Sequence, residues 1–245
     1  MARVLVPLPD TDFDPTETAA PWHTLTQAGH EVVFATEGGK APACDPLLLT
    51  GVVLGQLGAK PRPKELYTQM LASKECQHPI TWKAIVPGDY DMLVLPGGHA
   101  QGMKQYLASD ELHEKVGAFA SSGKPLGAIC HGVLVLARAK DPRTGKSVLH
   151  DRRTTCLPKY MERIAYFTTA WKVGRYYRTY DAYVEDEVKA ALGDAAQYER
   201  GPITLLQHGT ADDDRGAFVV EDGPYVSARW PGDAFLFAKR LLARL

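Results

Sequence analysis

The chain has 245 residues and a formal net charge of −1 at pH 7, so it can bury a full core and has no electrostatic bias toward nucleic acid or an anionic membrane. No apolar stretch approaches the roughly 18 residues that a bilayer span requires, and the N-terminus turns polar too early for a secretory signal. The four cysteines lie far apart without a Cys-x-x-Cys pair, which disfavours a zinc ribbon or a thioredoxin-type motif. We therefore expect a cytoplasmic protein, because a reducing compartment is the simplest setting for separate thiols.

The first half of the chain alternates predicted strands with predicted helices. The expected strands cover residues 3–7, 30–36, 91–95 and 125–129, and the expected helices cover residues 16–28, 64–73 and 109–121. Residues 40–63 contain four prolines and several glycines and are expected to be mostly loop. This alternation indicates an α/β fold with a parallel sheet and helices on both faces. In such sheets, functional sites form at the C-terminal ends of the strands.

The pattern is less regular after about residue 140. The expected elements are a strand over 152–157, a helical, aromatic-rich insert over 159–192, a hairpin over 218–228 and a closing helix over 231–245. Aromatic side chains alternate with arginines in the insert, a pattern that can bind nucleic acid. Because the chain has no net positive charge, we expect these side chains to pack in a cap or a subunit contact instead. No repeat or linker interrupts the chain, which predicts one domain over 1–245.

A sharp strand-to-helix turn is predicted at Cys130. Small and apolar residues precede it, and residues 132–138 have a helical pattern. A cysteine between a strand and a helix corresponds to the cysteine form of a nucleophile elbow, which holds the sulfur over the end of the sheet. We expect the helix N-terminus to lower the pKa of the thiol. The alternative is a buried, inert cysteine.

The segment Pro96-Gly97-Gly98 ends the strand expected over 91–95. Two glycines allow backbone N–H groups to turn toward a ligand. We expect the N–H groups of Gly98 and His131 to form an oxyanion hole beside Cys130. The alternative is an ordinary turn.

Two motifs carry a family resemblance. The segments Tyr-Asp-x-Leu-x-Leu-Pro-Gly-Gly-His at 90–99 and Gly-Lys-Pro-x-x-Ala-Ile-Cys-His-Gly at 123–132 resemble the DJ-1/PfpI superfamily. This resemblance implies a flavodoxin-like sandwich related to class I glutamine amidotransferases. Residues 15–18 and 29–40 resemble the Hsp31-like branch, which includes chaperones, proposed deglycases and glutathione-independent glyoxalases (glyoxalase III).

The resemblance assigns roles to individual residues. Glu17 matches the glutamate of the branch, Cys130 and His131 match its Cys-His pair, and Glu162 is the candidate for an acidic residue that follows a strand after the elbow. Cys130 would be the nucleophile, His131 would accept or relay a proton, and Glu162 would orient the imidazole. An ionised Glu17 would raise the pKa of a neighbouring thiol, so we expect Glu17 to be protonated and to donate to sulfur. The alternative for Glu162 is an ordinary solvated position on a helix.

The resemblance implies an enzyme that converts 2-oxoaldehydes such as methylglyoxal to 2-hydroxy acids, with a cysteine nucleophile and no glutathione. A second hypothesis is a cysteine hydrolase or hydratase of a C–N substrate, such as an amide, a cyclic imide or an isonitrile. A third is a stress chaperone or a thiol redox sensor. Pocket shape separates the first two, because a small closed pocket fits methylglyoxal and an open apolar pocket fits a larger metabolite. Glutamine amidotransferases use a His-x-Glu pair near the C-terminus, which this chain lacks.

The expected partners follow from the same observations. The eight histidines are scattered, so we predict no metal and no other cofactor. We expect a small-molecule substrate and no nucleic-acid or membrane partner. Superfamily members that resemble this chain are commonly homodimers, and we therefore expect a two-fold homodimer.

Overall fold

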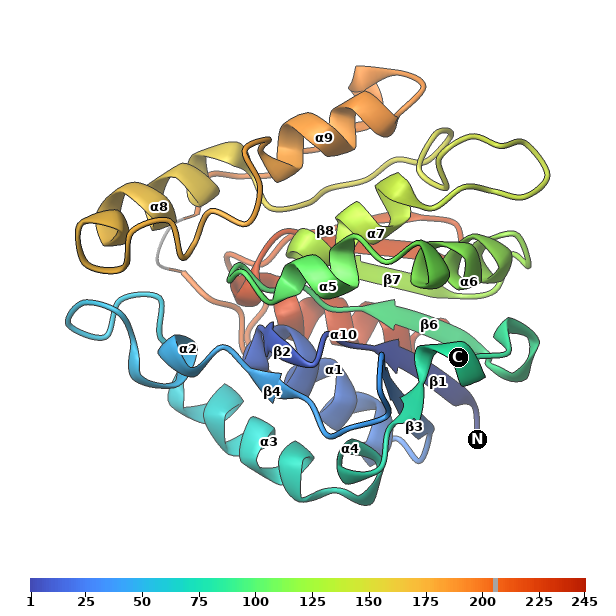
Figure 1. Cartoon of the computed structure of the whole chain (residues 1–245), viewed down its shortest axis with the longest axis horizontal. Helices are drawn as coiled ribbons and strands as arrows, with labels where there is room; N and C mark the ends of the chain where they lie inside the picture. The colour runs from blue at the N-terminus through green and yellow to red at the C-terminus, as the bar shows by residue number, and fades with distance from the viewer. Residues whose placement is uncertain (205–206) are drawn as a thin grey trace.

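A seven-stranded sheet forms the centre of the computed structural model, which describes residues 1–204 and 207–245 (Figure 1). The strand order is β5-β3-β1-β6-β7-β9-β8, and every neighbouring pair is parallel except the β8–β9 hairpin. The mostly parallel sheet expected from the sequence is therefore confirmed. The strands of this sheet are β1 (Arg3–Pro7), β3 (Glu31–Thr36), β5 (Ile80–Thr81), β6 (Met92–Leu95), β7 (Leu126–Ile129), β8 (Val219–Asp222) and β9 (Tyr225–Ala228), and β2 (Thr11–Phe13) pairs separately with β4 (Ala43–Cys44).

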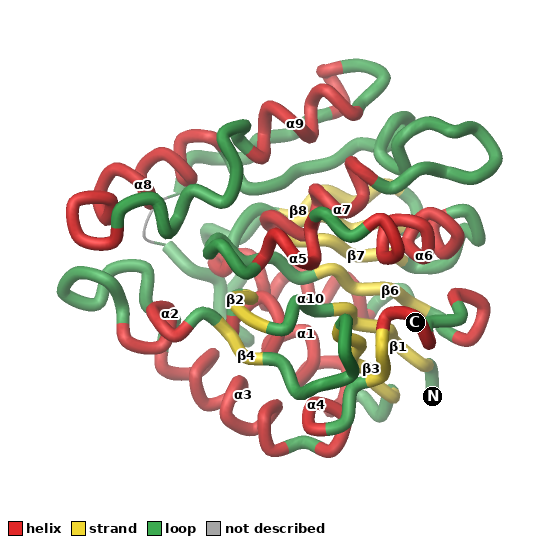
Figure 2. Tube along the Cα trace, in the orientation of Figure 1, coloured by secondary structure: helices red, strands yellow, loops and turns green. Residues whose placement is uncertain are grey.

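Helices cover both faces of the sheet (Figure 2). Their bounds are α1 (Pro15–Gln27), α2 (Pro46–Thr50), α3 (Pro61–Ala72), α4 (Lys74–Gln77), α5 (Met103–Leu107), α6 (Asp110–Ala120), α7 (Val133–Arg138), α8 (Lys159–Val173), α9 (Val184–Ala191) and α10 (Ala234–Leu242). Helices α1 and α10 pack together on one face, and α6 and α7 pack on the other. Because both faces are covered, β6 and β7 are buried along their whole length and consist of apolar and small residues.

The start of α1 places a carboxyl group at the C-terminal edge of the sheet. Asp14 caps this helix, since its Oδ1 accepts hydrogen bonds from the backbone N–H groups of Thr16 (2.7 Å) and Glu17 (3.1 Å). Pro15 occupies the first helical position, where a missing N–H costs nothing. Glu17 consequently lies in the first turn of α1, close to where β6 and β7 end.

One expectation about secondary structure is wrong. Residues 152–157 form no strand, because Thr155 donates its N–H to the Ser227 side chain (3.0 Å) and only Thr154 makes an isolated bridge. Residues 40–63 are mostly loop, as expected, although they also contain β4, α2 and the start of α3. Both helices begin with a proline in the first turn, where proline initiates a helix rather than breaking it.

The insert over 159–192 contains two helices, α8 and α9, joined by residues 174–183. Helix α9 packs on α7, and both insert helices lie beyond the layer that contains α7 (Figure 1). Among the described residues, no helix combines the length and the apolar character that a membrane span requires.

Gly132 generates a prediction about stability. A Cβ at this position would lie 2.6 Å from the carbonyl oxygen of Pro96 and closer still to that of Leu95. These are backbone atoms, which cannot rotate away, so Gly132→Ala should lower the free energy of unfolding by at least the roughly 1–3 kcal/mol typical of overpacking. Urea denaturation measures this change. Gly38→Ala, where nothing lies within 4 Å of the new Cβ, is the matched control. An unchanged urea midpoint for Gly132→Ala would show that the elbow can move away from β6.

Candidate active site

Cys130 occupies a strained turn directly after β7. Its φ angle is +58°, in the left-handed region that costs a residue with a side chain roughly 1–2 kcal/mol. A 3-10 turn over Cys130–Gly132 connects it to α7. A strained residue between a strand and a helix has the geometry of a nucleophile elbow, and it exposes Cys130 to a cavity at the C-terminal edge of the sheet.

The cavity beside Cys130 has a volume of about 680 Å³. Beside Cys130, its wall includes the side chains of Asp14, Thr16, Glu17 and His99 and the residue Gly98. The rest of the wall is largely apolar and includes Leu48, Leu57, Leu157, Met161, Ile164, Ala165, Tyr177, Trp230 and Pro231. The site thus has one reactive end and one apolar end.

Glu17 is completely buried at the reactive end. Its Oε2 accepts a hydrogen bond from the N–H of Gly97 (2.9 Å), while Oε1 has no hydrogen-bond partner among the described residues. Burial and the negative charge of Asp14 raise the pKa of Glu17 well above its usual value. Because Oε2 already accepts a hydrogen bond, a proton on this carboxyl group belongs on Oε1, where it is available to the sulfur or to a substrate.

The pKa of Cys130 is raised, not lowered as expected from the sequence. Burial is the largest cause, and the negative charges of Glu17 and Asp14 add to it. A hydrogen bond from the N–H of His131 acts in the opposite direction. Helix α7 has six residues and follows a 3-10 turn, so its positive end does not offset burial beside two carboxyl groups. The pKa values of both groups are therefore shifted toward their protonated forms, the thiol and the carboxylic acid.

His131 contacts the sulfur with a side chain that is not part of the cavity wall. Its Nδ1 lies 3.6 Å from Cys130 Sγ, and its side chain is buried. Burial lowers the pKa of His131 well below its usual value, and the neighbouring His99 and two arginines act in the same direction. His131 is consequently neutral and can accept the thiol proton.

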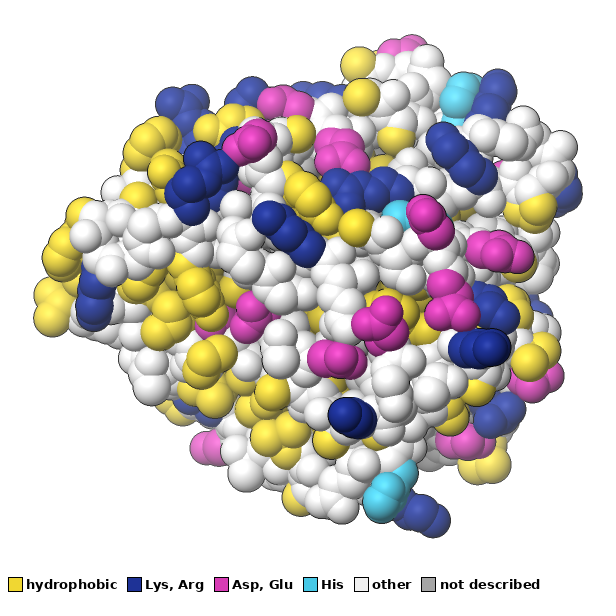
Figure 3. Space-filling view, in the orientation of Figure 1, with side chains coloured by type: hydrophobic (Ala, Val, Ile, Leu, Met, Phe, Trp, Pro, Cys, Tyr) yellow, Lys and Arg dark blue, Asp and Glu magenta, His cyan; other side chains and the backbone are white. Residues whose placement is uncertain are grey.

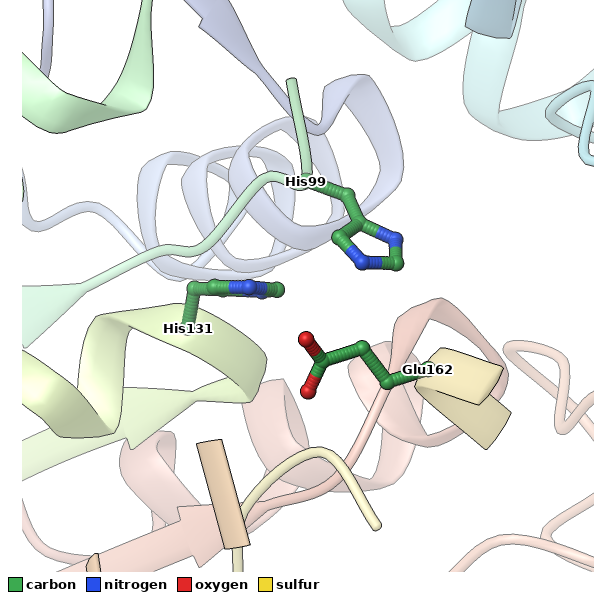
Figure 4. A group of neighbouring side chains, drawn as sticks. All are labelled: His99, His131 and Glu162. Carbon is green, nitrogen blue, oxygen red and sulfur yellow. The ribbon is translucent and has the colours of Figure 1, made fainter. Parts of the chain in front are cut away.

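Glu162 lies near His131 but is held by other groups. The side chains of His99, His131 and Glu162 converge, with candidate ligand atoms within 4.8 Å of one another (Figure 4). Glu162 Oε1 accepts from Arg178 Nη1 (2.7 Å), and Oε2 accepts from the N–H of Val184 (3.0 Å). Glu162 is 1% exposed, so the alternative of a solvated helix position is wrong. Its contacts leave it beside the imidazole without a direct hydrogen bond to it.

These three side chains are also the group that could hold a metal ion. Arg178 already neutralises the carboxylate of Glu162. Burial and the charge of Arg178 lower the pKa of His99 to about 3. The positive charge of Arg178 therefore already lies beside the carboxylate that would bind a metal ion. Our expectation of no required metal stays a prediction.

His99 is a site residue that the sequence analysis did not assign. Its ring contacts the rings of His131 (4.8 Å between centroids) and Tyr177 (5.5 Å) in tilted arrangements. Its Nε2 is buried without a hydrogen-bond partner in the described part of the chain, and the residue lines the cavity. The available signal was its position directly after the two glycines that end β6.

The two glycines have separate tasks. A Cβ on Gly97 would lie 2.7 Å from Glu17 Oε2 and 2.8 Å from the backbone nitrogen of His131, so only glycine allows this turn to pack against the elbow. The N–H of Gly97 is used by Glu17. The N–H of Gly98 has no acceptor among the described residues, and Gly98 lines the cavity. The oxyanion hole of Gly98 and His131 stays a prediction.

The aromatic residues of the insert divide between the cavity and the surface. Tyr177 is buried in the cavity wall and donates its hydroxyl hydrogen to Asp45 Oδ2 (2.9 Å). Phe167 and Trp171 on α8 are 63% and 73% exposed. Figure 3 shows hydrophobic side chains gathered at the end of the molecule where α8 lies. Tyr177 thus faces inward, Trp171 faces outward, and the homodimer stays a prediction.

A protein-family sequence model, described as ThiJ/PfpI family-like, matches residues 8–202 of the chain. The chain belongs to the ThiJ/PfpI family. It is 27% identical over 247 residues to an uncharacterised protein of Schizosaccharomyces pombe, and the alignment covers 98% of this chain and 82% of that protein. A deglycase of Pyrococcus abyssi is 30% identical over 156 residues, or 64% of this chain and 72% of the deglycase. A glutathione-independent glyoxalase of Schizosaccharomyces pombe is 27% identical over 148 residues, or 58% of each protein.

The solved structures confirm the fold of this family. Glyoxalase III from Candida albicans superposes with a TM-score of 0.73, covering 100% of this chain and 97% of that one at 19% identity. The flavodoxin-like sandwich that the sequence resemblance implied is therefore correct.

Asp14 generates a prediction about the thiol. Its charge raises the pKa of Cys130, and Asp14→Asn removes that charge while keeping an oxygen that can cap α1. We expect the pH midpoint for alkylation of Cys130 by iodoacetamide to move to lower pH, as measured by mass spectrometry of the labelled peptide. Asp110→Asn, exposed in the first turn of α6, is the control. A midpoint that stays in place or rises in Asp14→Asn would contradict this account of the raised pKa.

The same residue predicts a pH dependence of stability. Burial raises the pKa of Asp14 to about 6, above its ordinary value of 3.8. The folded state then binds more protons than the unfolded state between about pH 4 and pH 6, so stability falls as the pH rises through this window. Thermal unfolding of the wild type and Asp14→Asn across these pH values tests this. The variant should lose part of the fall, and identical profiles would show that Asp14 titrates normally.

Proposed function

We propose that this protein is a cofactor-free, cysteine-dependent enzyme that converts 2-oxoaldehydes to 2-hydroxy acids. The observation that carries the proposal is the pair formed by Cys130, on a strained turn, and the buried carboxyl group of Glu17, both facing one end of the cavity. A thiol and an acid with a free oxygen supply a nucleophile and a proton carrier. The deglycase and glyoxalases among the relatives support an enzyme of this kind.

The first step is addition of the thiol to the aldehyde. Cys130 Sγ forms a bond to the aldehyde carbon, the π electrons of the C=O bond move to oxygen, and the thiol proton ends on that oxygen. The product is a hemithioacetal. His131 Nδ1, 3.6 Å from the sulfur, accepts the thiol proton in transit. The free N–H of Gly98 stabilises the negative charge that develops on oxygen.

The second step moves a proton between the two substrate carbons. Glu17, which starts as the acid, gives its proton to the C2 carbonyl oxygen, and its carboxylate removes the hydrogen from C1, which forms an enediol. Glu17 then returns that proton to the C2 carbon and takes the proton of the C1 hydroxyl group, so that C2 becomes an alcohol, C1 becomes a thioester and Glu17 is again the acid. A raised pKa makes the Glu17 carboxylate a stronger base when ionised and keeps its acid form available near neutral pH. Water then cleaves the thioester, which releases the 2-hydroxy acid and restores the thiol.

Glu162 has a positioning role in this scheme. Its carboxylate holds Arg178 and the N-terminus of α9 against the two histidines. It therefore limits the movement of the His131 ring through packing and charge rather than through a direct hydrogen bond.

The size of the cavity favours a second candidate function. A wall that is mostly apolar over about 680 Å³ also suits a C–N substrate with a bulky group, such as an amide or an isonitrile. The same nucleophile would then attack a carbon bonded to nitrogen. A turnover screen of aldehydes, amides and isonitriles separates the two candidates.

Substitutions at the two central residues test the proposal. Cys130→Ser should abolish turnover of 2-oxoaldehydes, because a serine hydroxyl is a far weaker nucleophile than a thiol in this neutral site. Glu17→Gln keeps the shape but cannot exchange a proton, and kcat/KM should fall by roughly 10²–10⁴-fold. Steady-state release of the 2-hydroxy acid measures both effects.

Controls separate chemistry from folding. Glu111→Gln, on the exposed first turn of α6, should retain wild-type turnover. Circular dichroism should be unchanged in all variants. Near-normal activity of a folded Glu17→Gln enzyme would rule out proton transfer by Glu17.

A further inference from the structure

We infer that the substrate of this site carries a bulky apolar group of about ten or more heavy atoms next to its reactive carbonyl, and that a three-carbon dicarbonyl is not the preferred substrate. The inference rests on the proposed function, because it places the carbonyl at Cys130. It adds the class of molecule that the cavity accommodates.

The volume of the cavity is much larger than a three-carbon dicarbonyl needs. A water molecule occupies about 30 Å³ of the liquid, so a cavity of about 680 Å³ corresponds to roughly twenty water volumes. Methylglyoxal has five heavy atoms and would fill on the order of a quarter of this space or less. Most of the remainder would hold water against an apolar wall, where water finds few hydrogen-bond partners.

The wall of the cavity is mostly apolar. Three separate segments build the apolar end: α2 with Leu48, α8 with Met161 and Ala165, and the approach to α10 with Trp230. These side chains present apolar surface to the cavity, and a small polar substrate would leave that surface uncovered. Binding pockets with a mostly apolar wall and a few convergent polar groups fix one end of a ligand and gain affinity from the rest.

A loop that lines the cavity is held by contacts with α8. The loop over 51–60 crosses to α8, where Gln56 Nε2 donates to Thr168 Oγ1 (2.7 Å) and Lys172 Nζ donates to the carbonyl oxygen of Val52. Leu57, in the same loop, has a φ of +62° and lines the cavity. A non-glycine residue in this conformation is strained, and two contacts with α8 hold this loop, whose residues 55–60 line the cavity.

The charged groups of the wall agree with this division. Lys60 is exposed, and burial, together with the charge of Lys60, lowers the pKa of His208 to about 4, so His208 is neutral. Among the described residues of the wall, Lys60 is therefore the one cation, and it is exposed to solvent.

A series of 2-oxoaldehydes tests the inference on the wild-type enzyme. The series runs from methylglyoxal through longer alkyl chains to phenylglyoxal. We expect kcat/KM to rise by about fourfold for each added methylene over the first several, which is the gain from transferring one CH₂ group out of water. A flat or falling series would overturn the inference and leave the proposed function intact.

Filling the apolar end should remove this preference. Ala165 is 7% exposed and lines the cavity, whereas Ala170 on the same helix does not line it. We expect Ala165→Phe to reduce the ratio of kcat/KM for the longest aldehyde to that for methylglyoxal by tenfold or more. Ala170→Phe should keep the wild-type ratio, and Ala165→Leu provides a smaller filling group if the phenylalanine prevents folding. An unchanged ratio in a folded Ala165 variant would contradict the proposed location of the bulky group.

A binding measurement keeps the inference testable without turnover. Quenching of tryptophan fluorescence gives the Kd of 2-hydroxy acids of increasing chain length for the wild type, since Trp230 lines the cavity. Affinity should increase with chain length and lose this dependence in Ala165→Phe. If no 2-oxoaldehyde is converted but binding follows chain length, the proposed reaction is wrong and the apolar preference stands. If conversion occurs but binding ignores chain length, the inference alone is wrong.

Discussion

The hydrogen bond from the N–H of Gly97 to Glu17 Oε2 is the interaction on which the site depends. It joins the first turn of α1 to the end of β6 and holds both against the elbow after β7. A carboxyl group with one accepted hydrogen bond and no contact with water is more stable as the neutral acid. The same bond therefore assembles three elements of the fold, and it lowers the pKa of Glu17, whereas burial and the charge of Asp14 outweigh it and raise that pKa.

Other buried charges modify this arrangement without being part of the cavity chemistry. Asp233 is fully buried and paired with Arg229 (2.8 Å), and its negative charge raises the pKa of Glu17 further. The Arg229 guanidinium also donates to the carbonyl oxygen of Pro202 (2.6 Å), which ties Pro202 to the ion pair at the start of α10. Because a buried ion pair is expensive to break, this part of the framework resists rearrangement.

The sequence predicted the parts of the molecule that depend on local pattern. The apolar runs around Cys130 and before Pro96 predicted two parallel strands whose ends meet, and the structure contains both. It could not predict the direction of the Cys130 pKa shift, because burial and the nearby Asp14 are products of tertiary packing. The partners of Glu162 were hidden for the same reason, since Arg178 returns to it through the loop after α8. Periodicity also failed at 152–157, where side-chain hydrogen bonds replace a ladder.

The backbone conformation of Cys130 implies a compromise between stability and activity. A residue with a side chain at φ +58° loses roughly 1–2 kcal/mol relative to a relaxed backbone, and glycine at the same place would lose nothing. Selection for a robust fold alone would remove the cysteine from this turn. Its presence indicates that the protein tolerates a weaker framework at one position, as enzymes commonly do where a reactive group must be held exposed. Selection or engineering for thermostability should therefore favour Cys130→Gly early, because this substitution relieves the backbone strain. The protein would then lose its thiol.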